Sequence, residues 1–177
     1  NTGIASYAPA ARLYISGAFA PASLLLTNSA FWAGAEFEVA PDWLLGSSHN
    51  NESFTVNHSI VQEWSGALGG QGNSGNDPIF ADPLGPDGIP GSGDEDYRLL
   101  SGSPAINAGD PSFAPQAGET DLDGHARVLC GRADIGTYEF GIGDFNCDQR
   151  VDLNDFAIWP ACMTNPRPSA ILPGCEA

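Results

Sequence analysis

The sequence predicts an all-β protein in which short parallel strands stack into a solenoid. Three observations support this fold class: Gly and Pro are abundant, charged residues are few, and strand-like segments recur at a fixed spacing. The chain has 22 Gly and 14 Pro among 177 residues, and only 16% of its residues are charged. This composition is typical of short strands joined by many turns. The hydrophobic content of 42% is sufficient for a packed core.

The strand-like segments lie in residues 1–75. Residues 12–15, 23–32 and 53–62 are rich in β-branched and aromatic side chains and are separated by Gly, Pro, Asn and Ser. Within the last two, Thr-Asn-Ser-Ala-Phe overlays Asn-His-Ser-Ile-Val at an offset of 30 residues. Such a recurrence is expected when each rung of a solenoid stacks on the previous one. An antiparallel sandwich gives similar segments, so the spacing alone leaves both folds open.

From Asn76 onward the sequence is rich in turn phrases. In order, these are Asn-Asp-Pro-Ile-Phe-Ala-Asp-Pro, Asp-Glu-Asp-Tyr-Arg-Leu, Ser-Pro-Ala-Ile-Asn-Ala-Gly-Asp, Thr-Asp-Leu-Asp-Gly-His-Ala-Arg-Val and Asp-Ile-Gly-Thr-Tyr-Glu-Phe. Together they resemble the C-terminal end of secreted bacterial right-handed parallel β-helix proteins. The resemblance implies β-helix rungs in residues 1–75 and a C-terminal cap in residues 76–141. A polar, irregular cap would cover the unpaired end of a solenoid.

Residues 144–155 have the oxygen spacing of an EF-hand-type calcium loop. Oxygen-bearing side chains stand at loop positions 1, 3, 5, 9 and 12, and position 7 would contribute a backbone carbonyl. Ca²⁺ prefers six to eight oxygen ligands, and carboxylates this close together would repel one another without a cation. The predicted ligands are Asp144, Asn146, Asp148, Arg150 (through its carbonyl), Asp152 and Asp155.

The loop departs from the EF-hand pattern at two positions. Position 6 is Gln149 instead of Gly, so a side chain must tolerate positive φ there, at a cost of about 1 kcal/mol. Position 12 is Asp155, which is shorter than the usual Glu. With Asn146 and Val151, this makes roughly residues 143–165 resemble one repeat of a type I dockerin, a module that binds cohesins.

The resemblance implies that residues 142–177 form a dockerin-like, calcium-binding appendage. In that family loop positions 10 and 11 contact the cohesin partner, and these positions are Leu153 and Asn154 here. Pro160 lies soon after the loop and predicts that the following helix is short, because Pro interrupts a helix interior and disfavours helical geometry in the preceding residue.

All four cysteines lie in the second half of the chain, at positions 130, 147, 162 and 175. An even number of cysteines beside a predicted calcium loop favours an oxidising, extracellular or cell-surface location with two disulfides. We expect Cys162–Cys175 to close a Pro-rich loop, and Cys130–Cys147 to link the calcium loop to the preceding domain. Sequence alone leaves other pairings open.

The chain is strongly acidic, with a formal net charge of −16 and no Lys. Its charge is −4 over residues 1–76 and −12 over residues 77–177. Such a field repels nucleic acid and anionic membranes and attracts divalent cations or cationic partners. The sequence also has no apolar run long enough for membrane insertion.

Three further groups of residues are weaker candidates. Acidic residues at 82, 87, 94, 95 and 96 lie in a Gly-rich stretch, and Asp82, Asp87, Asp94 and Asp96 form a candidate second calcium site. Asp121 and Asp123 would face the same side of a strand, as the carboxylates of a glycosidase could, but they also fit an ordinary turn. Each of His49, His58 and His125 is isolated from any catalytic or zinc motif.

The function that these patterns favour is structural or adhesive. We expect a secreted or cell-surface β-helix protein whose calcium-stabilised dockerin-like module attaches it to a cohesin-like protein or a cell-surface matrix. One alternative is the C-terminal part of a pectate-lyase-like enzyme that acts on a polysaccharide. Another is the subunit of an extracellular filament, which would assemble through an open strand edge.

Overall fold

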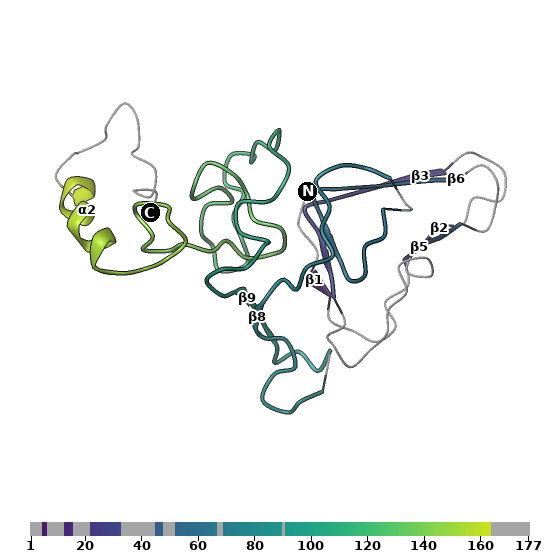
Figure 1. Cartoon of the computed structure of the whole chain (residues 1–177), viewed down its shortest axis with the longest axis horizontal. Coiled ribbons are helices and arrows are strands. Elements are labelled where there is room, and N and C mark those ends of the chain that lie inside the picture. Colours follow the sequence, from purple (N-terminus) through teal and green to yellow (C-terminus); the bar gives the residue numbers. More distant parts are fainter. Residues whose placement is uncertain are drawn as a thin grey trace.

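The computed structural model of the chain describes residues 5–6, 13–15, 22–32, 45–47, 52–66, 69–89 and 91–163. Its elements are β1 (Ala5–Ser6), β2 (Leu13–Ile15), β3 (Ala22–Thr27), β4 (Ala30–Phe31), β5 (Leu45–Ser47), β6 (Glu52–Asn57), β7 (Ile60–Val61), β8 (Phe80–Asp82), β9 (Asp96–Leu99) and α2 (Leu153–Met163). The arrangement is elongated: β2, β3, β5 and β6 lie at one end, β8, β9 and a set of loops in the middle, and α2 at the other end (Figure 1).

The N-terminal strands pair in parallel, about 30 residues apart. β3 pairs with β6 from Ala22↔Glu52 to Thr27↔Asn57. β4 pairs with β7 in the same register, with Ala30 opposite Ile60. The 30-residue overlay read from the sequence is therefore confirmed as the pairing register of these strands. Because the pairing is parallel, the antiparallel sandwich alternative is wrong for these strands.

A sharp corner separates β3 from β4 and β6 from β7. Asn28 and His58 occupy equivalent corner positions and have φ of 55° and 45°, in the left-handed region that Asn and His tolerate better than most residues. The next residue in each corner is a serine, and the Ser29 amide donates to the Ser59 hydroxyl oxygen at 3.3 Å. The polar residues of the recurring segment are thus the residues that turn the chain.

The apolar core continues from these strands into the middle of the molecule. Ala30 and Ile60 belong to a buried cluster that also contains residues of the later loops: Phe80, Leu99, Ala105, Ile106 and Ile135. β8 and β9 pair antiparallel, with Phe80 opposite Leu99. Residues 76–141 therefore pack against the end of the parallel strands, although they contribute only two short strands of their own.

The predicted right-handed parallel β-helix is wrong for the described part of the chain. The described strands form four small separate sheets, one of three strands and three of two, and they make no closed or solenoid sheet. The physical reason is that the parallel ladder has few rungs, with strands of two to six residues. After β7 the described chain adds only the parallel bridge Ile60↔Ser74 to this ladder, and outside the β8–β9 pair and the bridge Thr120↔Ala126 its backbone is satisfied mainly through turns and side-chain oxygens.

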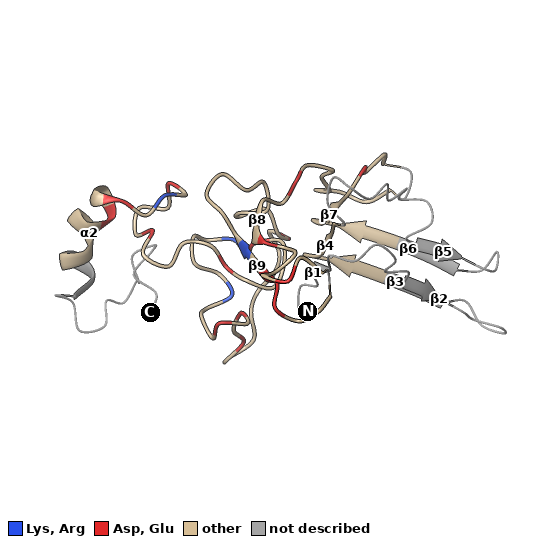
Figure 2. Ribbon diagram, turned by 90° about the horizontal axis from the view of Figure 1, so that it is seen from below, with Lys and Arg blue, Asp and Glu red and all other residues tan. Residues whose placement is uncertain are grey.

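Acidic residues are spread over the middle loops and the loop before α2, with few basic residues among them (Figure 2). No helix in the described part of the chain has the length and apolar character needed to cross a bilayer.

Candidate functional site

The loop of residues 144–155 is wound around two buried carboxylates. Asp144 and Asp155, at loop positions 1 and 12, are each only 2% exposed. The amides of Asp148 and Gln149 donate to the two carboxylate oxygens of Asp144, at 3.1 and 2.8 Å. The amides of Asn146 and Asp152 donate to those of Asp155, at 3.1 and 2.7 Å. The first and last predicted ligands are therefore brought to the inside of one loop.

Hydrogen bonds at loop positions 3, 5 and 7 hold the backbone in the same curved conformation. The Asp148 amide donates to Oδ1 of Asn146 at 2.8 Å, and the Arg150 amide donates to Oδ1 of Asp148 at 3.0 Å. Gln149 has φ of 66°, as expected for a residue that stands where the pattern calls for Gly. The positive φ predicted at loop position 6 is thus confirmed.

The electrostatics of the two buried carboxylates differ. Burial raises the pKa of Asp144 above its usual value, and the nearby charges of Asp155 and Asp148 raise it further. The pKa of Asp155 is lowered, chiefly by the hydrogen bond from the Asp152 amide. A cation among these groups would favour the ionised form of each.

The donor set fits a hard cation such as Ca²⁺. Carboxylate, amide and carbonyl oxygens are the ligands that Ca²⁺ takes, and an oxygen that accepts one amide hydrogen bond retains a second lone pair for an ion. The loop carboxylates do not form a group of three within 4.8 Å; in the described part of the chain that distance is met at Asp121, Asp123 and His125. Calcium binding at residues 144–155 therefore stays a prediction.

α2 begins at Leu153, loop position 10, so the last three loop residues form its first turn, and the helix presents apolar side chains to solvent. Leu153 is 85% exposed, Phe156 65% and Trp159 41%, and the rings of Phe156 and Trp159 stack with centroids 5.9 Å apart. Asn154, the second predicted contact residue, is also exposed. The helix runs through Pro160 to Met163, so it is short but does not end where the Pro suggests.

A disulfide connects the loop to the middle of the molecule. Cys130 and Cys147 are bonded, with their Cα atoms 5.7 Å apart, which confirms the predicted pairing. In the chain-entropy view, closing a loop of this size stabilises the folded state by about 3 kcal/mol. The second predicted pair, Cys162–Cys175, includes a residue outside the described part of the chain and stays a prediction.

Of the acids proposed for a second calcium site, Asp87, Asp94 and Asp96 already accept hydrogen bonds from their own stretch of chain. Asp87 and Asp94 share the Ser92 hydroxyl, which lies 3.3 Å from Oδ1 of Asp87. Oδ1 of Asp87 accepts the Ile89 amide at 2.8 Å, and Oδ1 of Asp94 accepts the Ser92 hydroxyl at 2.8 Å. Asp96 pairs with Arg98 at 3.0 Å. With the exposed Asp82 they form no compact group of three among the described residues. The second calcium site has no structural support beyond its composition.

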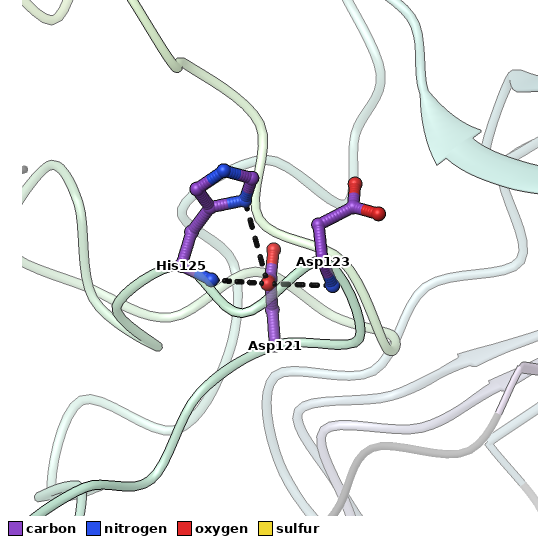
Figure 3. Close-up of side chains that lie close together, drawn as sticks. All are labelled: Asp121, Asp123 and His125. Carbon is purple, nitrogen blue, oxygen red and sulfur yellow. Dashed lines mark hydrogen bonds and ion pairs between the residues drawn. The ribbon is translucent and has the colours of Figure 1, made fainter.

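Asp121, Asp123 and His125 lie close together at one turn (Figure 3). Oδ1 of Asp121 accepts the amides of Asp123 and His125, at 2.9 and 2.8 Å. The Asp123 carboxylate turns away and binds Arg98 through two bonds of 2.8 and 2.6 Å. Since their oxygens serve the turn and an arginine, the pair does not resemble two carboxylates flanking a scissile bond.

Behind this turn lies a buried ionic cluster that sequence reasoning missed. Arg127 pairs with Glu139 at 2.7 Å, and both side chains are almost fully buried. Asp134 accepts the amides of Asn107 and Phe140, each at 2.6 Å, and Asp121 accepts the Glu139 amide at 3.1 Å. These four residues, Asp121, Arg127, Asp134 and Glu139, come from the last two turn phrases of the sequence. Their contacts connect the middle loops to one another.

The pKa values within the cluster are strongly perturbed. Burial, together with the charge of Asp134, raises the pKa of Glu139 to about 9, against the opposing effect of Arg127. Burial raises the pKa of Asp134 to about 6. Since three buried carboxylates face one guanidinium, ionising all of them would leave excess negative charge in the interior.

Comparison of the chain with protein-family models, curated proteins and solved structures found no match. The proposed function therefore depends on the residues and geometry of this chain.

Proposed function

We propose that this protein is an extracellular or cell-surface attachment protein whose calcium-stabilised loop and α2 bind a cohesin-like protein. The single observation that carries the proposal is the position of an exposed apolar helix face immediately after a loop wound on two buried carboxylates. The loop fixes the start of the helix, and the helix presents the surface.

The exposed residues have the character of a protein contact. Leu153, Phe156 and Trp159 are large apolar side chains on a short helix in an otherwise acidic region. Aromatic side chains are enriched at the centres of protein interfaces, where burying them supplies much of the binding energy. Leu153 and Asn154 are also the residues that the dockerin resemblance assigns to partner binding.

Calcium supplies the stability of this arrangement. Bound among the loop oxygens, the ion would neutralise carboxylates whose mutual repulsion otherwise opposes the loop. The disulfide Cys130–Cys147 supports an oxidising compartment, where extracellular calcium is abundant.

The test is titration of the full chain with Ca²⁺ by calorimetry, followed by binding to a panel of immobilised cohesin domains with calcium or with EDTA. We expect calcium-dependent cohesin binding that Leu153→Asp weakens at least tenfold. Leu122→Asp is the matched control, because Leu122 is 69% exposed but lies on a turn of the middle loops. Absence of heat with Ca²⁺, or equal effects of the two substitutions, would refute the proposal.

A further inference from the structure

A cavity of about 560 Å³ lies between the middle loops and the segment that leads into the calcium loop. One wall comes from residues 119–129 and the other from residues 141–145. The walls are mainly apolar and include Ala126, Leu129, Ile142 and Phe145. A pocket of this size and lining is typical of a small-molecule site, since a cavity of about 150 Å³ already accommodates benzene.

One polar side chain in the wall is His125. Its Nδ1 lies 3.5 Å from Oδ1 of Asp121, and the other ring nitrogen points away from Asp121 (Figure 3). The Asp121 carboxylate is fixed by the amides of Asp123, His125 and Glu139. The position of the Asp121 carboxylate is therefore set by backbone hydrogen bonds and does not depend on a ligand.

Nδ1 of His125 is buried and makes no hydrogen bond among the described residues. The approach of the Asp121 carboxylate to 3.5 Å is therefore a charge contact, and this contact defines what His125 offers to a ligand. A carboxylate facing Nδ1 favours the tautomer with the proton on Nδ1, which leaves Nε2 as a hydrogen-bond acceptor. A ligand that satisfies Nε2 must therefore bring a donor, such as a hydroxyl group.

Charge restricts the ligand further. Glu119 is among the residues that line the cavity, and the chain carries a net charge of −16. Both disfavour an anion such as a carboxylate. The apolar walls disfavour an extended polar molecule such as a sugar, because its other hydroxyl groups would lose their hydrogen bonds to water.

We propose that this cavity binds a neutral aromatic molecule bearing a hydroxyl group, a compound of the phenol class. The ring packs against Leu129, Ile142 and Phe145, and the hydroxyl donates to Nε2 of His125. This site goes beyond the attachment function. Its lining contains no predicted calcium ligand and no α2 residue, although Phe145 lies in the calcium loop, and cresol binding and cohesin binding are measured separately.

The site is tested on the ¹⁵N-labelled full chain by NMR titration with p-cresol in the presence of Ca²⁺. We expect saturable shifts at the amides that line the cavity, such as those of Gly124, Ala126 and Leu129. Toluene, which lacks only the hydroxyl, should bind about fivefold more weakly, the effect of one neutral hydrogen bond. 4-Hydroxybenzoate should bind more weakly than p-cresol because of its charge.

Two variants test whether Nε2 of His125 accepts the hydrogen bond from the ligand hydroxyl. His125→Phe keeps an aromatic ring but removes the acceptor, and we expect it to lower p-cresol affinity about fivefold while toluene affinity is kept. Leu122→Ala, on the same turn but outside the cavity, should change neither. If His125→Phe does not fold, the Nε2 resonance of His125 in the native chain must still shift with p-cresol and not with toluene. Scattered shifts, no shifts, or equal affinity for p-cresol and toluene would overturn the proposal.

Discussion

Replacing Gln149 with Gly should strengthen the calcium loop. Gln149 has φ of 66°, and holding a residue with a Cβ in this region costs about 1–2 kcal/mol. Gly adopts this conformation without strain. It loses more backbone entropy on folding, however, and this cancels about 0.5–1 kcal/mol of the stabilisation. We therefore expect a net stabilisation of about 1 kcal/mol.

The hydrogen bonds at this position do not depend on the side chain. The Gln149 amide donates to Oδ2 of Asp144 at 2.8 Å, and its carbonyl accepts the Ser101 hydroxyl at 2.8 Å. Gly retains both groups, so the strain can be removed without loss of contacts. To the extent that the loop forms only with its ion, the gain corresponds to about fivefold tighter calcium binding.

The assay is calorimetric titration with Ca²⁺, combined with thermal melting in EDTA to capture any gain in the metal-free state. Gln149→Ala is the control, because it removes the same side chain but keeps the Cβ and therefore the strain. If Gln149→Gly behaves like Gln149→Ala in both measurements, the argument from backbone strain is wrong.

Three other perturbations test the middle of the molecule. Arg127→Met should lower the free energy of unfolding at neutral pH by about 1–3 kcal/mol, because it leaves the buried, protonated Glu139 carboxyl without its polar partner; an unchanged free energy in urea denaturation would contradict this. The raised pKa values of Glu139 and Asp134 mean that the folded state binds more protons than the unfolded state. Stability is then fully present below the unfolded pKa values, near pH 4, and is lost as the pH rises to about 9. The melting temperature should fall across this range, with a shallower slope in Glu139→Gln; a flat profile would refute the assignment. Replacing Cys130 and Cys147 together with Ser should cost about 3 kcal/mol, and an unchanged denaturation midpoint would count against the disulfide as a source of stability.

Local features were predictable from the sequence. Three of them are present in the structure: the positive φ of Gln149, the 30-residue register of β3 with β6, and the Cys130–Cys147 bond, which was one of several pairings that the sequence left open. Each depends on residues whose identity limits the available geometry: a turn position, a pair of thiols, or a repeated polar corner.

The global arrangement was not predictable in the same way. A repeated strand pattern shows that two segments can pair, but it does not show how many rungs join or whether a sheet closes. Asp121, Arg127 and Glu139 looked like parts of solvated turns, because the sequence does not show which acids become buried. Their burial depends on loops that approach one another in space. The cavity beside His125 left no sequence signal, since its two walls come from separate turn segments and are mostly apolar.

If the protein is held through α2, as proposed, the bond between Cys130 and Cys147 has a mechanical consequence. A pull on α2 passes through the sulfur bridge to Cys130, which bypasses the chain between two cysteines 17 positions apart. Residues 141–145 lie within that sheltered stretch. A force applied to α2 would therefore not be transmitted through residues 141–145. This wall of the cavity would keep its shape while α2 is under load.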